Sequence, residues 1–89
     1  MEWKIEFLPE ARKELNALDK EAARRILRFL GDRVAVDPNP RRFGEPLRGP
    51  ALGKYWRYRV GDYRIIAAIQ NEEITIIIVR IGHRKDVYR

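Results

Sequence analysis

Two short segments of the chain hold the side chains best suited to chemistry on a phosphate group. The first, Lys54–Arg64, reads KYWRYRVGDYR and interleaves basic with aromatic residues. The second, Ile81–Tyr88, reads IGHRKDVY and contains the single histidine of the chain, His83. Arginine forms paired hydrogen bonds with phosphate oxygens, and histidine, with a reference pKa of about 6.5, carries protons near neutral pH. Together these residue types predict a surface that binds anions and moves protons.

The distribution of charge supports this interpretation. The chain has 19 Lys and Arg against 13 Asp and Glu, a net charge of +6. Residues 1–40 carry eight basic and eight acidic groups and sum to zero, whereas residues 41–64 carry seven and two, a net charge of +5. Residues 80–89 carry four basic groups and one acidic group, a net charge of +3. An excess confined to two segments favours a polyanion partner over a surface that is merely kept soluble.

Length and composition exclude several classes of protein. A chain of 89 residues predicts a single small domain spanning residues 1–89. It has no cysteine, one histidine and no cluster of Asp and Glu at ligand spacing, so we expect no metal and no cofactor. No apolar run is long enough to span a bilayer, and the opening MEWKIEFLPE is unlike a signal peptide. We therefore expect a cytoplasmic protein.

The first half of the chain predicts a strand followed by two helices. Residues 2–7 alternate between apolar and charged, which is typical of a half-buried strand. Pro9 suits the first turn of a helix that extends to Leu18. Asp19 is a favourable N-cap for a second helix, whose apolar positions recur at helical spacing as far as Val34. The cluster of basic residues on the outer face of this helix is interpreted as a solvated surface: Arg24, Arg25 and Arg28.

The second half predicts a loop and a three-stranded antiparallel meander. Residues 37–53 hold four of the five prolines and three of the six glycines, so we expect a loop, pinned to the core by Leu47 and Leu52. Three strands follow, at residues 54–60, 63–70 and 74–81, with a two-residue turn at Gly61–Asp62. Gly82 is expected to end the last strand. The fold class is α+β, with all strands in one sheet. Whether the first strand lies at an edge or in the centre stays open.

Alternation within the first meander strand assigns its side chains to two faces. Tyr55, Arg57 and Arg59 share one face. Trp56 and Tyr58 share the other with Val60 and are expected in the core.

The whole pattern resembles the RelE/ParE superfamily of bacterial and archaeal toxins from type II toxin–antitoxin operons. The resemblance covers nearly the whole chain and depends on its length, the order of its elements, the run LRGPALGKYWRYRVGDYRII and the ending RIGHRKDVY. The chain is more similar to the RelE branch, which are messenger-RNA interferases, than to the ParE branch, which poison DNA gyrase. The resemblance implies mRNA cleavage in the ribosomal A site, inhibition of translation, and neutralisation by a RelB-like antitoxin.

The resemblance also implies roles for individual residues. Arg57 falls where RelE has a lysine implicated in activating the nucleophile, and Lys54 lies near a second such lysine, which Tyr55 matches more directly. Arg64 matches the arginine that holds the scissile phosphate. The remaining matches are in the tail: Arg84 for assistance to the leaving group, Tyr88 for stacking on the substrate, and His83 where RelE has lysine.

Metal-independent RNA cleavage sets the tasks for these residues. The neighbouring 2′-hydroxyl attacks the phosphate, one proton leaves it, another reaches the departing 5′-oxygen, and the extra negative charge must be stabilised. Arg57, Arg64 and Arg84 can bind one phosphate from three sides. Arginine is a poor proton carrier because its pKa lies far above neutrality, so His83 is an alternative acid or base. The identity of the general base stays open.

Other basic residues complete the predicted RNA-binding surface. We expect phosphate contacts from four of them: Lys54, Arg59, Arg80 and Lys85. Arg59 and Arg80 can instead pair with acidic residues, namely Glu72, Glu73 or Asp86. Tyr88 either stacks on a splayed base or anchors the tail to the core.

Two alternatives to an endoribonuclease remain. One is a ParE-like toxin that inhibits gyrase by protein contact and has no need of the set His83, Arg84 and Tyr88. The other is a small RNA-binding protein or a toxin that has lost its activity.

Overall fold

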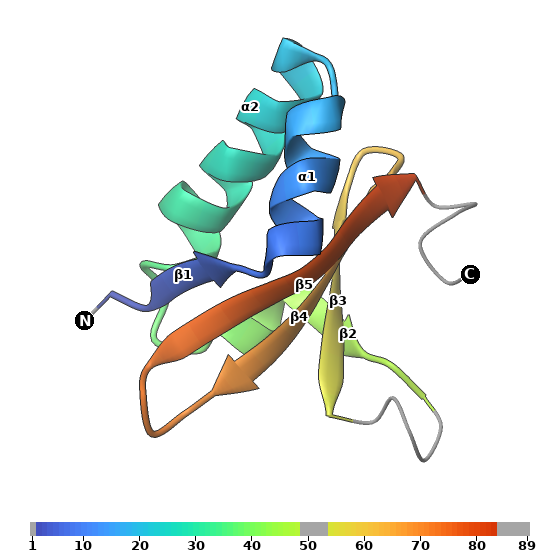
Figure 1. Cartoon of the computed structure of the whole chain (residues 1–89). Coiled ribbons are helices and arrows are strands. Elements are labelled where there is room, and N and C mark those ends of the chain that lie inside the picture. The colour runs from blue at the N-terminus through green and yellow to red at the C-terminus, as the bar shows by residue number, and fades with distance from the viewer. Residues whose placement is uncertain (1, 49–53, 84–89) are drawn as a thin grey trace.

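The computed structural model describes residues 2–48 and 54–83 and consists of one mixed sheet covered on one face by a helical hairpin (Figure 1). The strands are β1 (Lys4–Phe7), β2 (Gly44–Pro46), β3 (Tyr55–Val60), β4 (Tyr63–Gln70) and β5 (Thr75–His83), and the helices are α1 (Pro9–Ala17) and α2 (Lys20–Arg28). A π-helix (Phe29–Val34) extends α2, and a 3-10 helix (Pro40–Phe43) precedes β2. The sheet order is β1-β5-β4-β3-β2. The predicted α+β fold class is confirmed.

The helical hairpin forms where the sequence predicts it. Pro9 begins α1, and the Asp19 carboxylate accepts a hydrogen bond from the Ala22 amide at 2.8 Å, which caps α2. Ile26 and Leu30 are completely or almost completely buried against the sheet. Within residues 2–48 and 54–83, no helix combines the length and apolar character that crossing a membrane requires.

The β3–β4 hairpin confirms the predicted two-residue turn. Val60 pairs with Tyr63, and Gly61 has a φ of +60°, a conformation that favours glycine. The antiparallel pairing continues from β4 to β5. β1 lies at the edge and runs parallel to β5, which settles the position that alternation left open. β5 extends through Gly82 to His83, so the expectation that Gly82 ends this strand is wrong: Gly82 still pairs with Arg64.

The segment expected to be a loop contains an additional strand. β2 pairs with β3 and closes the far edge of the sheet. The preceding 3-10 helix is held by Tyr58, which is completely buried and whose hydroxyl donates to the Pro40 carbonyl at 2.8 Å. Burial raises the pKa of Tyr58 to about 12, so this hydroxyl stays protonated at neutral pH. The Phe29 ring packs edge-on against both Tyr58 and Phe43 and completes the contact.

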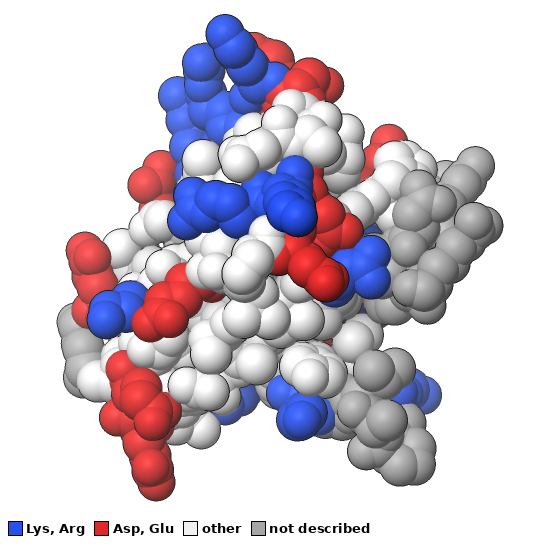
Figure 2. Space-filling view, in the orientation of Figure 1, with Lys and Arg blue, Asp and Glu red and all other residues white. Residues whose placement is uncertain are grey.

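Charges of both signs are intermixed on the face seen in Figure 2, including the surface over the helical hairpin. This agrees with the zero net charge of residues 1–40. On this face, the helical hairpin therefore carries charges of both signs.

Candidate functional site: a basic face of the sheet

The pairing of β3 with β4 brings three of the predicted arginines onto one face of the sheet. Arg59 pairs directly with Arg64. Arg57 pairs with Ile66, two residues further along each strand and therefore on the same face. The alternating neighbours Tyr58, Val60 and Ile65 are buried in the core beneath the helices. The three arginines therefore project from the opposite side, which we call the open face. This is the arrangement that alternation predicted for Arg57 and Arg59.

The spacing on the open face suits a single anion. Directly opposed residues in an antiparallel pair have Cβ atoms about 4.5–5.5 Å apart, which applies to Arg59 and Arg64, and diagonal neighbours such as Arg57 and Arg64 lie about 7–8 Å apart. Arginine side chains are long enough to meet across either separation. Two like charges directly opposite each other are unfavourable unless an anion lies between them. Arginines at these positions are therefore close enough for their side chains to share one anion.

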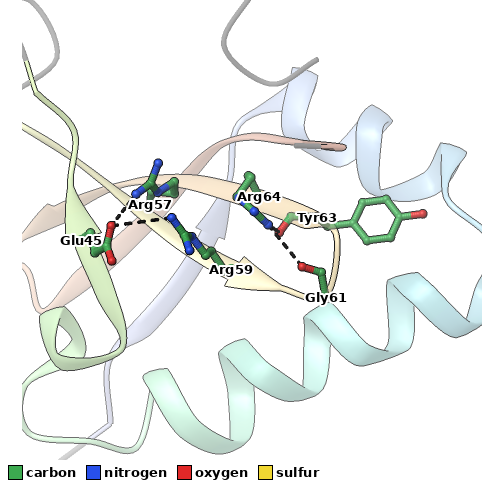
Figure 3. Close-up of polar contacts among 6 residues, drawn as sticks. All are labelled: Glu45, Arg57, Arg59, Gly61, Tyr63 and Arg64. Atoms are coloured by element: carbon green, nitrogen blue, oxygen red, sulfur yellow. Dashed lines mark hydrogen bonds and ion pairs between the residues drawn. The ribbon is translucent and has the colours of Figure 1, made fainter. Parts of the chain in front are cut away.

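Glu45 on β2 contributes a carboxylate to this arginine group (Figure 3). It pairs with Arg57 in the sheet register and is both hydrogen-bonded and ion-paired to the Arg57 guanidinium. Its Oε2 also lies 4.0 Å from Nη2 of Arg59. The hydrogen bond from Arg57, followed by the charges of Arg57 and Arg59, lowers the pKa of Glu45 below its usual value of 4.5. Glu45 is therefore ionised at neutral pH.

The sequence did not reveal Glu45 because β2 has only three residues. A strand of this length shows no periodicity, and it lies among prolines and glycines that are typical of a loop. The available signal was its charge: Glu45 and Asp62 are the only acidic residues among residues 41–64, which carry seven basic ones. An isolated carboxylate in a basic segment is a candidate partner for one of its arginines.

Arg64 differs from the other two arginines in its contacts. Its Nη1 donates to the backbone carbonyls of Gly61 and Tyr63 at 3.2 and 3.1 Å, so the guanidinium is turned toward the hairpin (Figure 3). No carboxylate of the described residues forms an ion pair with it. Three guanidinium groups and one carboxylate leave this site with a net charge of +2. An incoming anion finds the least neutralised positive charge at Arg64.

A cleft of about 230 Å³ opens beside this group, between the 3-10 helix and β3. Its lining residues combine three arginines with one aromatic ring and Glu45: Arg42, Phe43, Gly44, Glu45, Arg57 and Arg59. Arg42 lies over the Phe43 ring and 3.6 Å from the Asp37 carboxylate. The cleft thus brings Arg42 of the 3-10 helix to the same opening as Arg57 and Arg59.

Arg59 and Arg80 pair with carboxylates other than those expected. Arg59 lies near Glu45, and Arg80 binds Glu14 on α1 through Nη2 at 3.1 Å. The expected partners Glu72 and Glu73 lie in the β4–β5 turn, at the opposite end of β5 from Arg80. The third expected partner, Asp86, lies outside the described residues. These expectations missed the pair with Glu45 because β2 was not predicted, and the pair with Glu14 because it depends on how α1 packs against β5.

The structure does not bring His83 to the open face. His83 pairs with Tyr63, its ring lies 6.1 Å from the Tyr63 ring, and Tyr63 pairs in turn with the core residue Val60. His83 therefore projects from the helix-side face, whereas its neighbour Gly82 lies opposite Arg64. A shift in the β4–β5 register between Ile66 and Ala67 causes this orientation, because it reverses the alternation in the last part of β5.

The remaining predicted residues are only partly placed. Lys54 is exposed, with its ammonium 5.3 Å from the centroid of the Tyr55 ring. Three tail residues lie outside the described residues: Arg84, Lys85 and Tyr88. Among residues 2–48 and 54–83, no group of three or more acidic or histidine side chains is arranged to hold a metal ion.

Comparison with known proteins places this fold among the toxins of the RelE/ParE superfamily. The family model described as "ParE toxin of type II toxin-antitoxin system, parDE" matches residues 5–88, so the chain belongs to this family. The resemblance inferred from sequence is confirmed.

Individual relatives cover nearly the whole chain. Toxin RelG of Mycobacterium tuberculosis is 33% identical over 90 residues, which is 100% of this chain and 99% of the relative. The toxin–antitoxin complex RelBE2 of M. tuberculosis contains a chain that matches with a TM-score of 0.84 and 28% identity, covering 97% of this chain and 95% of that one. A chain of the archaeal RelE–RelB complex of Pyrococcus horikoshii matches with a TM-score of 0.75 and 30% identity, covering 98% and 100%.

Proposed function

We propose that this toxin is an endoribonuclease that cleaves mRNA in the ribosomal A site without a metal ion, through attack by the 2′-hydroxyl on the adjacent phosphate. The observation that carries the proposal is the open face, where Arg57, Arg59 and Arg64 project together from paired positions of β3 and β4. Guanidinium groups that bind one phosphate together stabilise the charge that develops in the transition state. Arg64, which has no carboxylate partner among the described residues, is the proposed ligand of the scissile phosphate.

The remaining roles are assigned by what each side chain can do. Arg57 and Arg59 complete the phosphate contacts once the RNA competes with Glu45 for them. Glu45 acts as a counter-ion, because Arg57 and Arg59 lower its pKa and make it a weak base at neutral pH. Arg84 and Tyr88 keep their proposed roles with the leaving group and the substrate base. The proposed role of His83 in proton transfer requires its side chain to move from the helix-side face to the open face when the substrate binds.

The decisive experiment measures growth arrest and transcript cleavage after induction of the toxin. We expect Arg64→Ala to relieve growth arrest and to slow cleavage about 100-fold, as removal of one preorganised charge contact typically does. Arg57→Ala should act in the same direction. Arg24→Ala is the matched control, because Arg24 is an exposed arginine of α2. If both open-face variants stay fully toxic, the assignment of the phosphate contacts is wrong.

A second candidate function is inhibition of DNA gyrase, and the match to the ParE toxin family model favours it. In that case the basic face would bind protein, and no RNA would be cleaved. Mapping of transcript ends after induction separates the two functions. Cuts at regular codon positions support the endoribonuclease, whereas double-strand DNA breaks with intact transcripts support the gyrase inhibitor.

We also propose a cognate RelB-like antitoxin as partner. Two of the relatives above were solved as complexes with an antitoxin. An acidic segment is the natural complement of the open face, since complementary charge speeds and directs association. Cytoplasmic location follows from the same proposal, because the ribosome and the antitoxin are found there.

A further inference from the structure

The carboxylate of Glu14 on α1 holds the outer edge of β5 where β1 no longer covers it. β1 pairs with β5 only as far as Phe7 and Ile78, and the Leu8 amide then donates to the Ile78 carbonyl at 2.9 Å. Further along β5, Oε1 of Glu14 accepts from the Ile81 backbone amide at 2.9 Å. A side chain thus supplies the hydrogen bond that a neighbouring strand would otherwise make.

The same carboxylate binds Arg80. Its Oε2 accepts from both Nε and Nη2 of Arg80 at 3.2 and 3.1 Å, and Oε1 lies 3.4 Å from the same Nε. Glu14 itself is fixed in place, because Ala11 and Leu15 on either side of it are 0% and 5% exposed in the core. The helix backbone at Glu14 is thus anchored in the core, while its side chain, 27% exposed, is oriented by its bonds to Arg80 and the Ile81 amide.

The segment that Glu14 holds lies directly beside Arg64. Arg80 pairs with Ile66, Ile81 with Ile65, and Gly82 with Arg64. This is also the part of β5 beyond the register shift, where four consecutive residues, Arg80 to His83, still pair with β4. Ile81 is only 1% exposed, so its amide has no ready access to water if Glu14 is removed.

We propose that Glu14 is a positioning residue for the RNA site: it fixes the last residues of β5 against β4 and so sets the place of Arg64. Arg80 is the counter-ion of Glu14 in this arrangement and is not a phosphate ligand. The inference rests on the proposed endoribonuclease function for its effect on cleavage, whereas its effect on β5 is independent of that function.

Three variants separate these roles. Glu14→Ala removes both contacts of the carboxylate. Glu14→Gln keeps an oxygen that can accept from the Ile81 amide but loses the charge that holds Arg80. Arg80→Ala leaves Glu14 free to bind the Ile81 amide. Glu10→Ala is the matched control, because Glu10 is an exposed carboxylate one turn earlier on α1.

Two quantities are measured for each variant: amide exchange at Ile81 by NMR, and kcat and KM for cleavage of an mRNA on programmed ribosomes. For Glu14→Ala we expect amide exchange at Ile81 to rise about tenfold and kcat to fall about tenfold, with KM within twofold of the parent. Glu14→Gln should restore the protection of Ile81 and bring kcat to within about threefold of the parent. Arg80→Ala and the control should leave KM unchanged.

Opposite results would overturn the proposal. If Arg80→Ala raises KM several-fold while Glu14→Ala lowers it, Arg80 is a phosphate ligand that Glu14 restrains. Unchanged exchange and unchanged kcat in Glu14→Ala would remove any positioning role. If Glu14→Ala fails to fold, Glu14→Gln decides, and a tenfold loss of kcat despite a protected Ile81 amide would contradict the proposal. Failure of the parent protein to cleave RNA refutes the proposed function alone, because exchange at Ile81 still reports on Glu14.

Discussion

At the scale of single residues, the site is defined by how its positive charge is neutralised. Arg57 and Arg59 share the Glu45 carboxylate, whereas Arg64 has only backbone carbonyls as described partners. Backbone carbonyls carry partial charge, so they satisfy the hydrogen bonds of a guanidinium without neutralising it. Arg64 is therefore the position at which an incoming phosphate gains most, and Glu45 is the group with which it competes at Arg57.

The lowered pKa of Glu45 predicts how the stability of the fold depends on pH. The folded state favours ionised Glu45, so this residue stabilises the fold above its usual pKa of 4.5, and the contribution is lost as the pH falls through the lower folded-state value. Urea unfolding should show the parent more stable than Glu45→Gln at neutral pH. The difference should vanish in acid. A difference that persisted at the acid end would mean that the ion pair with Arg57 is not its source.

The arginines could be predicted from sequence because their placement needs only local rules. A two-residue turn after a strand of alternating residues fixes which side chains face each other, so Arg57, Arg59 and Arg64 fall on one face as soon as the turn is recognised. Glu45 could not be placed in this way, because its contact with Arg57 depends on tertiary packing of a segment that has no periodicity of its own.

At the scale of elements, a register shift between β4 and β5 determines which face of the sheet carries His83, the predicted proton carrier. In a regular strand, His83 would share a face with Ile77, which pairs with the open-face position Ala68. The shift between Ile66 and Ala67 adds one residue to β5 and turns His83 to the other face. The apolar run of this strand gives no sign of the shift, since isoleucine and valine suit both faces. The existence of β5 was therefore predictable from the sequence. The face of the sheet that each of its side chains occupies beyond Ile78 was not.

The short strand β2 depends on a glycine at its start. A Cβ added to Gly44 would lie 2.7 Å from the Arg57 carbonyl oxygen and 2.9 Å from the Tyr58 ring, and neither group can move freely. We expect Gly44→Ala to destabilise the fold by about 1–3 kcal/mol, as overpacking of a tight contact typically does, and to separate Glu45 from Arg57. Urea unfolding measures the first effect.

Gly31 provides the matched control for this substitution. A Cβ at Gly31 meets no atom within 4 Å, and the residue lies in the helical segment after α2. Gly31→Ala should therefore be neutral or stabilise by up to about 1 kcal/mol, because alanine favours helical backbone. Equal destabilisation by the two substitutions would show that close packing around Gly44 is not the cause.

At the scale of the whole molecule, the fold keeps two functions apart. The helical hairpin covers one face of the sheet and supplies the core, and its surface charges cancel over residues 1–40. The opposite face is left for the arginines of β3 and β4. The order of elements was sufficient to predict this α+β arrangement, whereas the edge position of β1 and the presence of β2 required the three-dimensional structure.

Because the helices and the open-face arginines lie on opposite faces of the sheet, arginines of the two faces should affect the salt dependence of RNA binding unequally. Each phosphate neutralised on a single strand contributes about −0.7 to the slope of log affinity against log salt concentration. Arg64→Ala should therefore make the slope less steep by about 0.7, when binding is measured with a single-stranded RNA whose 2′-hydroxyls are methylated to prevent cleavage. Arg24→Ala on α2 removes the same charge from the molecule but not from the open face, so the slope should be unchanged. Equal changes of the slope for the two variants would mean that RNA affinity depends on the net charge of the protein. The open face would then not be the binding surface.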